Sequence, residues 1–144
     1  MSNSDNPPNG ADFEKKVLGW LEDHYDIEFE LQKSISIGNP KADITKPHRF
    51  DIAGTDKHIA IECKRYTWTK AGNVPSAKMG FINEAVFYLN CLPDDYQKYI
   101  VMLKSYNAKR DLFLSDYYFK TNKHLLGDVK ILEYDPENKN MRLL

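Results

Sequence analysis

The sequence predicts an α/β fold in which helices flank a mixed β-sheet. Apolar residues recur at three- to four-residue intervals in three segments, which is typical of amphipathic helices. In five other segments they alternate with polar residues or run continuously, as they do in strands. The predicted order is helix, three strands, helix, strand, helix, strand, and 144 residues is the size of one domain.

The first ten residues are rich in Asn, Ser and Pro and have nothing to bury. We therefore expect residues 1–10 to be a disordered tail and residues 11–144 to form a single domain. A helix is predicted from Ala11 or Asp12 to about His24, with Asp12 as its N-cap. Its apolar residues share one face: Phe13, Val17, Leu18, Leu21 and Tyr25.

Three consecutive strands are predicted next, and the second and third form a hairpin. Residues 27–37 form the first strand, because their apolar residues are all odd-numbered and share one face. The turn-rich residues 38–47 form a loop. Residues 49–53 and 58–65 are the next two strands, joined by the tight turn GTDK at 54–57.

The second half of the chain alternates between helix and strand. Ser76 is expected to cap a helix that runs to about residue 92. The continuously apolar residues 99–103 predict a central strand, residues 111–126 a helix, and residues 129–134 a last strand. The rest of the chain is expected to be a turn and a short tail.

Composition favours a soluble protein of a reducing compartment. No apolar run approaches the roughly 18 residues of a membrane span, and no signal peptide is visible. Cys63 and Cys91 form neither a disulfide framework nor a metal-binding spacing. We therefore expect a cytoplasmic protein without membrane association.

The net charge of −1 hides an uneven distribution. Residues 1–40 carry three lysines and eight acidic residues, for −5, whereas residues 41–78 carry eight basic and four acidic residues, for +4. Residues 79–144 carry nine of each. Local positive charge on a neutral chain suits an enzyme that holds a polyanion and then releases it.

The stretch HIAIECKR, at 58–65, places two charged residues within an apolar strand. Alternation puts Glu62 and Lys64 on the face opposite Cys63, whose thiol is expected to face the core. A buried charge costs several kcal/mol unless it is paired, hydrated or bound to metal. Glu62 and Lys64 must therefore face a cleft, a partner or water.

A two-residue turn centred in GTDK would pair residues whose numbers sum to 111 and would place Asp51 opposite Ala60. Glu62 would then be the diagonal neighbour of Asp51 on the same face, with Lys64 one step further on. Two carboxylates about 5 Å apart repel by about 3 kcal/mol at an effective dielectric constant of 20. Lys64 offsets one charge, and Glu14 would add a third carboxylate if its helix packs nearby. Such an oxygen-rich, negative cluster suits Mg²⁺ or Mn²⁺.

These residues resemble a known family. Phe50 and Asp51, nine intervening residues, and IECK at 61–64 resemble the PD-(D/E)XK nuclease superfamily, which has the restriction-endonuclease-like fold. The acidic residue Glu14 on a preceding helix and the Ser-capped helix that follows fit the same pattern. ECKRY resembles the Mrr-type branch, and the length and element order resemble small Holliday-junction resolvases. Phe50 replaces the nominal Pro, and no Gln-rich signature follows.

The resemblance implies a three-layer sandwich and a Mg²⁺- or Mn²⁺-dependent endonuclease that hydrolyses phosphodiester bonds in DNA. By resemblance, Asp51 and Glu62 hold the metal with the backbone carbonyl of Cys63, and Glu14 completes the shell. Lys64 would orient or help deprotonate the attacking water, so that Asp51, Glu62 and Lys64 are the catalytic residues. Cutting both strands would favour a homodimer.

Four residues after the catalytic strand are candidates for nucleic-acid binding. Arg65, Trp68 and Lys70 interleave cationic and aromatic groups that can hold phosphates and stack on bases. Lys78 lies in the first turn of a helix, where the dipole disfavours it, which hints at a phosphate contact. Trp68 is equally typical of a residue that plugs the core.

Other interpretations fit the same residues. Asp51, Glu62 and Lys64 could form a cross-strand ion pair on a solvated face, worth under about 1 kcal/mol. The chain could also be a non-catalytic nucleic-acid-binding or assembly module of the same fold, or an ordinary protein-interaction domain. The nucleic-acid-binding module would need no Mg²⁺, and the protein-interaction domain would show no salt-dependent affinity for DNA.

Overall fold

The computed structural model describes residues 9–144, and its elements follow the predicted order with additions. The elements are α1 (Gly10–His24), β1 (Phe29–Ile37), β2 (Lys46–Gly54), β3 (Ile59–Lys64), α2 (Ser76–Asn90), β4 (Gln97–Leu103), β5 (Tyr106–Asn107), β6 (Leu112–Phe113), α3 (Leu114–Asn122), the 3₁₀ helix η1 (Lys123–Leu125), β7 (Lys130–Asp135) and β8 (Asn140–Leu143). Residues 1–8 of the expected tail lie outside the described residues, and Gly10 belongs to α1.

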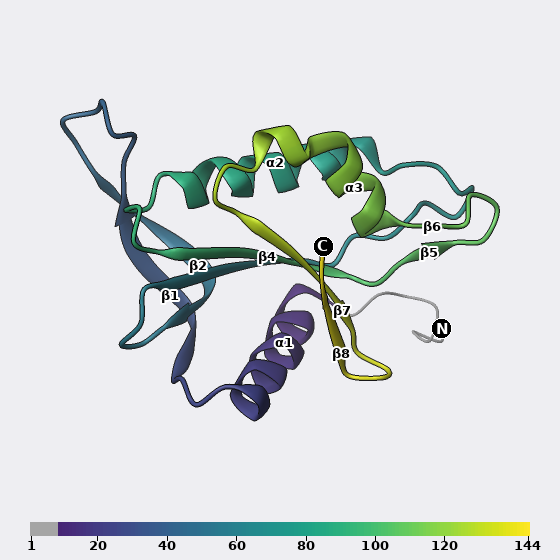
Figure 1. Cartoon of the computed structure of the whole chain (residues 1–144), viewed down its shortest axis with the longest axis horizontal. Helices are drawn as coiled ribbons and strands as arrows, with labels where there is room; N and C mark the ends of the chain where they lie inside the picture. The colour runs from purple at the N-terminus through teal and green to yellow at the C-terminus, as the bar shows by residue number, and fades with distance from the viewer. Residues whose placement is uncertain (1–8) are drawn as a thin grey trace.

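A mixed six-stranded sheet in the order β1-β2-β3-β4-β7-β8 forms the middle layer. The β1–β2, β2–β3 and β7–β8 pairs are antiparallel, whereas β3, β4 and β7 are parallel. Parallel neighbours need crossover connections, and α2 and α3 supply them. Figure 1 shows α2 and α3 above the sheet and α1 below it. The predicted α/β class and the sheet flanked by helices are confirmed.

The two faces of the sheet form separate cores. Against α1 pack Ile52, Ile59 and Ile61, which contact the helix residues Phe13, Val17 and Leu21. Against α2 and α3 pack alternate residues of the same strands: Phe50, Ala60, Ile100, Met102 and Ile131. The alternation predicted for the third strand is therefore present, with odd-numbered β3 residues facing α1 and even-numbered ones facing the α2 side.

The prediction that residues 27–37 have a single apolar face is wrong. Phe29 and Leu31 pack in the core beneath α1, whereas Ile35 and Ile37 pack against the α2 core. Between them Gln32 has a φ of 54°, a left-handed conformation that reverses which side later residues face. The same reversal occurs on β2, where Phe50 packs in the α2-side core and Ile52 packs in the core beneath α1. The hairpin therefore passes from one layer to the other at Gln32 and Asp51.

The register of the β2–β3 hairpin also differs from expectation. Ala53 pairs with Ala60 and Ile52 with Ile61, so paired numbers sum to 113. The turn is longer than two residues, and a Cβ on Gly54 would lie 2.5 Å from the carbonyl oxygen of Lys57. A shift of two residues leaves the faces of the paired residues unchanged, and it brings Asp51 from a diagonal position to one directly beside Glu62.

Smaller corrections concern helix ends and short strands. Asn9 rather than Asp12 caps α1, because the Asn9 side chain accepts the Asp12 backbone N–H at 2.8 Å. Ser76 is the first residue of α2 and makes no capping hydrogen bond, since the cap is Pro75. The β5–β6 hairpin and β8 were not predicted. None of the helices within residues 9–144 is both long and apolar enough to cross a lipid bilayer.

Candidate active site

Asp51 lies where β2 and β3 stop pairing. The pairs between these strands end at Ile52 and Ile61, so the next part of β2 pairs only with β1. The Cys63 backbone N–H donates instead to the Asp51 carboxylate, at 2.8 Å. This hydrogen bond holds one carboxylate oxygen of Asp51 against the end of β3 and leaves the other oxygen free of that contact.

Glu62 is the buried acid beside it. Only 7% of Glu62 is exposed, and its Oε1 has no hydrogen-bond partner within the described residues. Burial raises the pKa of Glu62 to about 8, helped by the negative charge of Asp51 and opposed by Lys64. A buried carboxylate oxygen without a partner is costly, so this position is unfavourable unless a proton or a cation neutralises it.

Lys64 ends β3 on the same face as Glu62 and is half-buried. Its positive charge lowers the pKa of both Glu62 and Glu14, although burial raises each more strongly. Asp51, Glu62 and Lys64 are thus close enough to influence one another, at the carboxyl end of a parallel strand. Ligands of open α/β sheets commonly bind at this edge.

Glu14 approaches the site from the other layer. Its helix packs beneath the sheet, and its carboxylate accepts a hydrogen bond from the Gln32 side chain. Burial raises the pKa of Glu14, and the charge of Asp51 raises it further. Within residues 9–144, no three His, Cys, Asp or Glu side chains form a group that could hold one metal ion. Glu14 lies near enough to Asp51 for the two charges to interact, and its role as a further metal ligand stays a prediction.

The remaining oxygen donors still suit a hard dication. Mg²⁺ is often held by only one or two carboxylates, with waters and substrate phosphates completing its shell. Asp51 and Glu62 provide that number, and the unpartnered Glu62 Oε1 is the kind of group that an ion would satisfy. The carbonyl of Cys63 stays an expected third ligand. The residues present therefore fit Mg²⁺ or Mn²⁺ without Glu14.

The predicted nucleic-acid-binding residues separate into two kinds. Lys70 and Lys78 are exposed, and the Lys78 ammonium lies 5.6 Å from the centre of the Tyr66 ring. Arg65 is half-buried beside the start of α1. Its Nε would lie 3.8 Å from a Cβ added at Gly10. Trp68 is only 8% exposed and belongs to the α2-side core. Trp68 is therefore a core residue, and its ring is too buried to stack on bases.

Two neighbours of the site are not among the predicted site residues. Gln32 orients Glu14, and its left-handed conformation has no sequence signal. The His48 ring stacks on Tyr88 of α2, with centroids 4.2 Å apart. Burial lowers the pKa of His48, against the opposing charge of Asp51. His48 precedes Phe50 by two positions on β2, and its place at a strand end is the sequence signal that puts it near this cluster.

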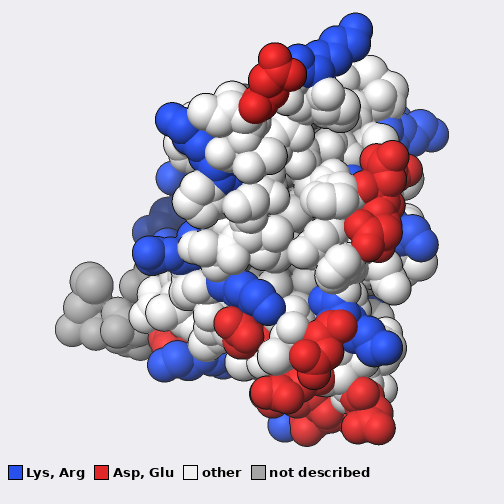
Figure 2. Space-filling model, turned by 90° about the vertical axis from the view of Figure 1, so that its left-hand side faces the viewer, with Lys and Arg blue, Asp and Glu red and all other residues white. Residues whose placement is uncertain are grey.

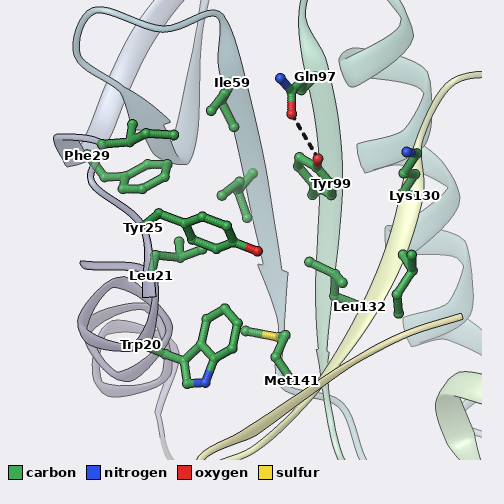
Figure 3. A pocket seen from close by; sticks show the side chains of 13 residues that line it. Trp20, Leu21, Tyr25, Phe29, Ile59, Gln97, Tyr99, Lys130, Leu132 and Met141 are labelled. Carbon is green, nitrogen blue, oxygen red and sulfur yellow. Dashed lines mark hydrogen bonds between the residues drawn. The ribbon is translucent and has the colours of Figure 1, made fainter. Parts of the chain in front are cut away.

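A hollow of about 300 Å³ lies elsewhere, at the opposite end of the parallel strands (Figure 3). Trp20 and Tyr25 form one wall, and the Tyr99 hydroxyl donates to Gln97 at 2.9 Å in another. None of its described lining residues carries a carboxylate. The hollow is therefore separate from Asp51 and Glu62.

The exposed acidic residues gather away from the site. Figure 2 shows many acidic side chains at the lower end of one side of the molecule, where Figure 1 places the C-terminal part of α1. Exposed acids in and after this part of the chain are Glu22, Asp23, Asp26, Glu28 and Glu30. A polyanion would be repelled from that end.

Comparisons of the chain with known protein families, with curated protein sequences and with solved structures found no significant match.

Proposed function

We propose that this protein is a Mg²⁺- or Mn²⁺-dependent endonuclease of restriction-endonuclease-like fold that hydrolyses phosphodiester bonds in DNA. The observation that carries the proposal is the buried Oε1 of Glu62, which lacks a partner beside a second carboxylate, Asp51, and a lysine, Lys64. A structural ion pair would leave no such oxygen. The resemblance of FD and IECK to PD-(D/E)XK nucleases supports the same proposal.

In the proposed reaction the chain's own groups divide the work. The Cys63 N–H fixes the rotamer of Asp51, and burial fixes Glu62, so that both carboxylates are held in place before a ligand arrives. A bound dication would lower the pKa of a coordinated water and polarise the scissile phosphate. The Lys64 ammonium, on the Glu62 face, would orient the water and offset charge that develops on the phosphate.

Nicking of supercoiled plasmid DNA in Mg²⁺ or Mn²⁺ tests the proposal. Lys64→Ala should lose roughly 10²- to 10³-fold in rate, the usual effect of removing one group that stabilises developing charge. Lys57→Ala is the matched control, since it removes the same charge from the exposed turn at the far end of β3. Equal nicking by wild type and Lys64→Ala, with both folded, would eliminate the mechanism.

The same assay separates the enzyme from a non-catalytic DNA-binding module. A module would bind DNA equally well with Mg²⁺ or with a chelator, and Asp51→Asn would leave binding unchanged while no nicking occurred in any sample. An enzyme would nick DNA only with the dication, and a chelator would stop the reaction.

A further inference from the structure

Hydrogen bonds hold the short β5–β6 hairpin against the loop at residues 65–75, which follows the proposed catalytic strand β3. The Asn107 side chain donates to the Gly72 carbonyl at 2.9 Å and accepts the Arg110 backbone N–H at 3.2 Å. The Trp68 backbone N–H donates to Ser105 Oγ at 3.1 Å. Gly72, with a φ of 80°, lets the two segments approach, because a Cβ there would lie 3.3 Å from Asn107 Nδ2. The two segments thus form one wall, defined here as residues 65–75 and 104–113.

This wall rises from the sheet edge that carries Lys64. Because β3 and β4 are parallel, with Lys64 opposite Met102, the segments that follow them leave the sheet at the same edge. Figure 1 shows the β5–β6 hairpin and the segment before α2 extending together away from the β1–β2 hairpin. A chain bound across Asp51 and Glu62 would therefore meet the wall next.

Three exposed cations of the wall have no acidic partner among residues 9–144. Lys70, Lys109 and Arg110 are exposed and make no salt bridge with any acid in residues 9–144. By contrast, Lys104 of the same wall is paired with Asp135 at 3.2 Å. Asp111, the wall's acidic residue, accepts a hydrogen bond from the Tyr106 hydroxyl.

Arg110 is held in position by Trp68. Its guanidinium lies 5.2 Å from the centre of the Trp68 ring, which is itself fixed in the core and packs against Tyr117. Stacking on a fixed aromatic face reduces the rotamer freedom that an exposed arginine would otherwise lose on binding. A planar guanidinium held in this way is suited to bidentate contact with a phosphate.

We propose that this wall is the clamp that holds the DNA backbone beside the proposed active site, with Arg110, Lys109 and Lys70 contacting phosphates and Trp68 positioning Arg110. The clamp rests on the proposed function, because it names where the substrate of that site is gripped. In this proposal Trp68 does not stack on a base; it positions the Arg110 guanidinium, which contacts the phosphate.

Fluorescence anisotropy of a labelled DNA duplex of mixed sequence, titrated with protein in the presence of a chelator, tests the clamp without cleavage. Lys109→Ala and Arg110→Ala should each weaken binding about three- to tenfold. Each should also lower the slope of log affinity against log salt concentration by about 0.9, the value for one duplex phosphate contact. Arg110→Lys should keep the salt slope and lose part of the affinity. Lys57→Ala, at the opposite edge, should match wild type.

Trp68 offers a second readout. In a Trp20→Phe background Trp68 is the remaining tryptophan, since the chain has two. Duplex DNA should change its fluorescence, because a phosphate would compete for the guanidinium that lies over the ring, and Arg110→Ala should remove the change.

The outcomes separate the two proposals. If wild type nicks plasmid but Lys109→Ala and Arg110→Ala bind duplex with wild-type affinity and salt slope, the clamp is overturned and the nuclease stands. If wild type neither nicks plasmid nor binds duplex, the proposed function fails and the clamp fails with it. Binding that weakens in the wall variants, without nicking by any sample, supports the clamp on a non-catalytic module.

Discussion

The Asp51 carboxylate accepts the Cys63 backbone N–H at 2.8 Å across the point where β2 and β3 separate. One side chain thereby performs two tasks. It satisfies a strand N–H that no neighbouring β2 carbonyl reaches, and it holds a negative charge beside Glu62. Structure and proposed chemistry can be separated by substitutions that remove one task and keep the other.

Asp51→Asn should fold like wild type and lose activity. The asparagine oxygen can still accept the Cys63 N–H, while the charge that would bind a dication is gone. Plasmid nicking should fall at least about 10²-fold. Mg²⁺ at a hundred times its Kd should raise the unfolding free energy of wild type by about 2.7 kcal/mol, which is seen as a higher thermal midpoint. The thermal midpoint of Asp51→Asn should not change with Mg²⁺.

Asp51→Ala is the companion variant. It leaves the Cys63 N–H without its acceptor and should lose a further 1 to 3 kcal/mol or so of unfolding free energy in urea. If Asp51→Ala and Asp51→Asn unfold at the same urea concentration, the hydrogen bond has no structural role.

Glu62→Gln should stabilise the metal-free protein. Burial raises the pKa of Glu62 to about 8 in the folded state, above its ordinary value of 4.5. The folded protein then binds this proton more tightly than the unfolded chain does, so stability contributed by protonated Glu62 is present at low pH. It is lost as pH rises from about 4.5 towards 8. The neutral amide avoids that loss and can donate to Asp51.

Thermal unfolding in a chelator, followed between pH 5 and pH 8, checks this prediction. Wild type should lose more stability than Glu62→Gln over that interval, and the variant should be more stable by roughly 1 to 3 kcal/mol at the upper end. Parallel curves for the two proteins would show that Glu62 titrates near its ordinary pKa. Glu62→Gln should also fail to nick plasmid.

Arg142 ties the last strand to α3. Its two terminal nitrogens donate to the Asp116 carboxylate at 3.1 and 3.0 Å, and its Nε donates to Glu133 at 3.1 Å. Glu133 is buried and otherwise receives a hydrogen bond from Ser115. Arg142→Ala would leave that buried carboxylate without its counter-charge, and should cost about 2 to 4 kcal/mol in urea unfolding.

Lys120→Ala, on an exposed face of α3, serves as the comparison and should change stability by less than about 0.5 kcal/mol. Residual nicking by folded Arg142→Ala should equal that of wild type, because this network does not include the candidate site. A loss of nicking in fully folded Arg142→Ala would mean that β8 influences the chemistry.

Periodicity in the sequence predicted the layers, the central strands and the face shared by Glu62 and Lys64, because burial of apolar residues enforces a period of two. It could not predict the reversal at Gln32, since a left-handed glutamine has no signature in composition. The longer turn at Gly54 shifted the register by two residues, which alternation alone cannot detect.

The remaining differences have similar causes. Each strand of the β5–β6 hairpin has two residues, too few to show a period. Trp68 fits either of its two interpretations by sequence, and only the packing of the loop on β4 and α3 distinguishes them. Glu14 belongs to the helix beneath the sheet, yet the charge of Asp51 raises its pKa, so its place in one cluster with Asp51 and Glu62 stays a prediction.

The change of face at Gln32 and Asp51 makes the β1–β2 hairpin the segment shared by both hydrophobic cores. Side chains on one half of it are held by α1, and those on the other half by α2. The position of Asp51 therefore depends on the packing of both layers. Partial unfolding of either layer would dismantle the candidate centre before the sheet itself is lost.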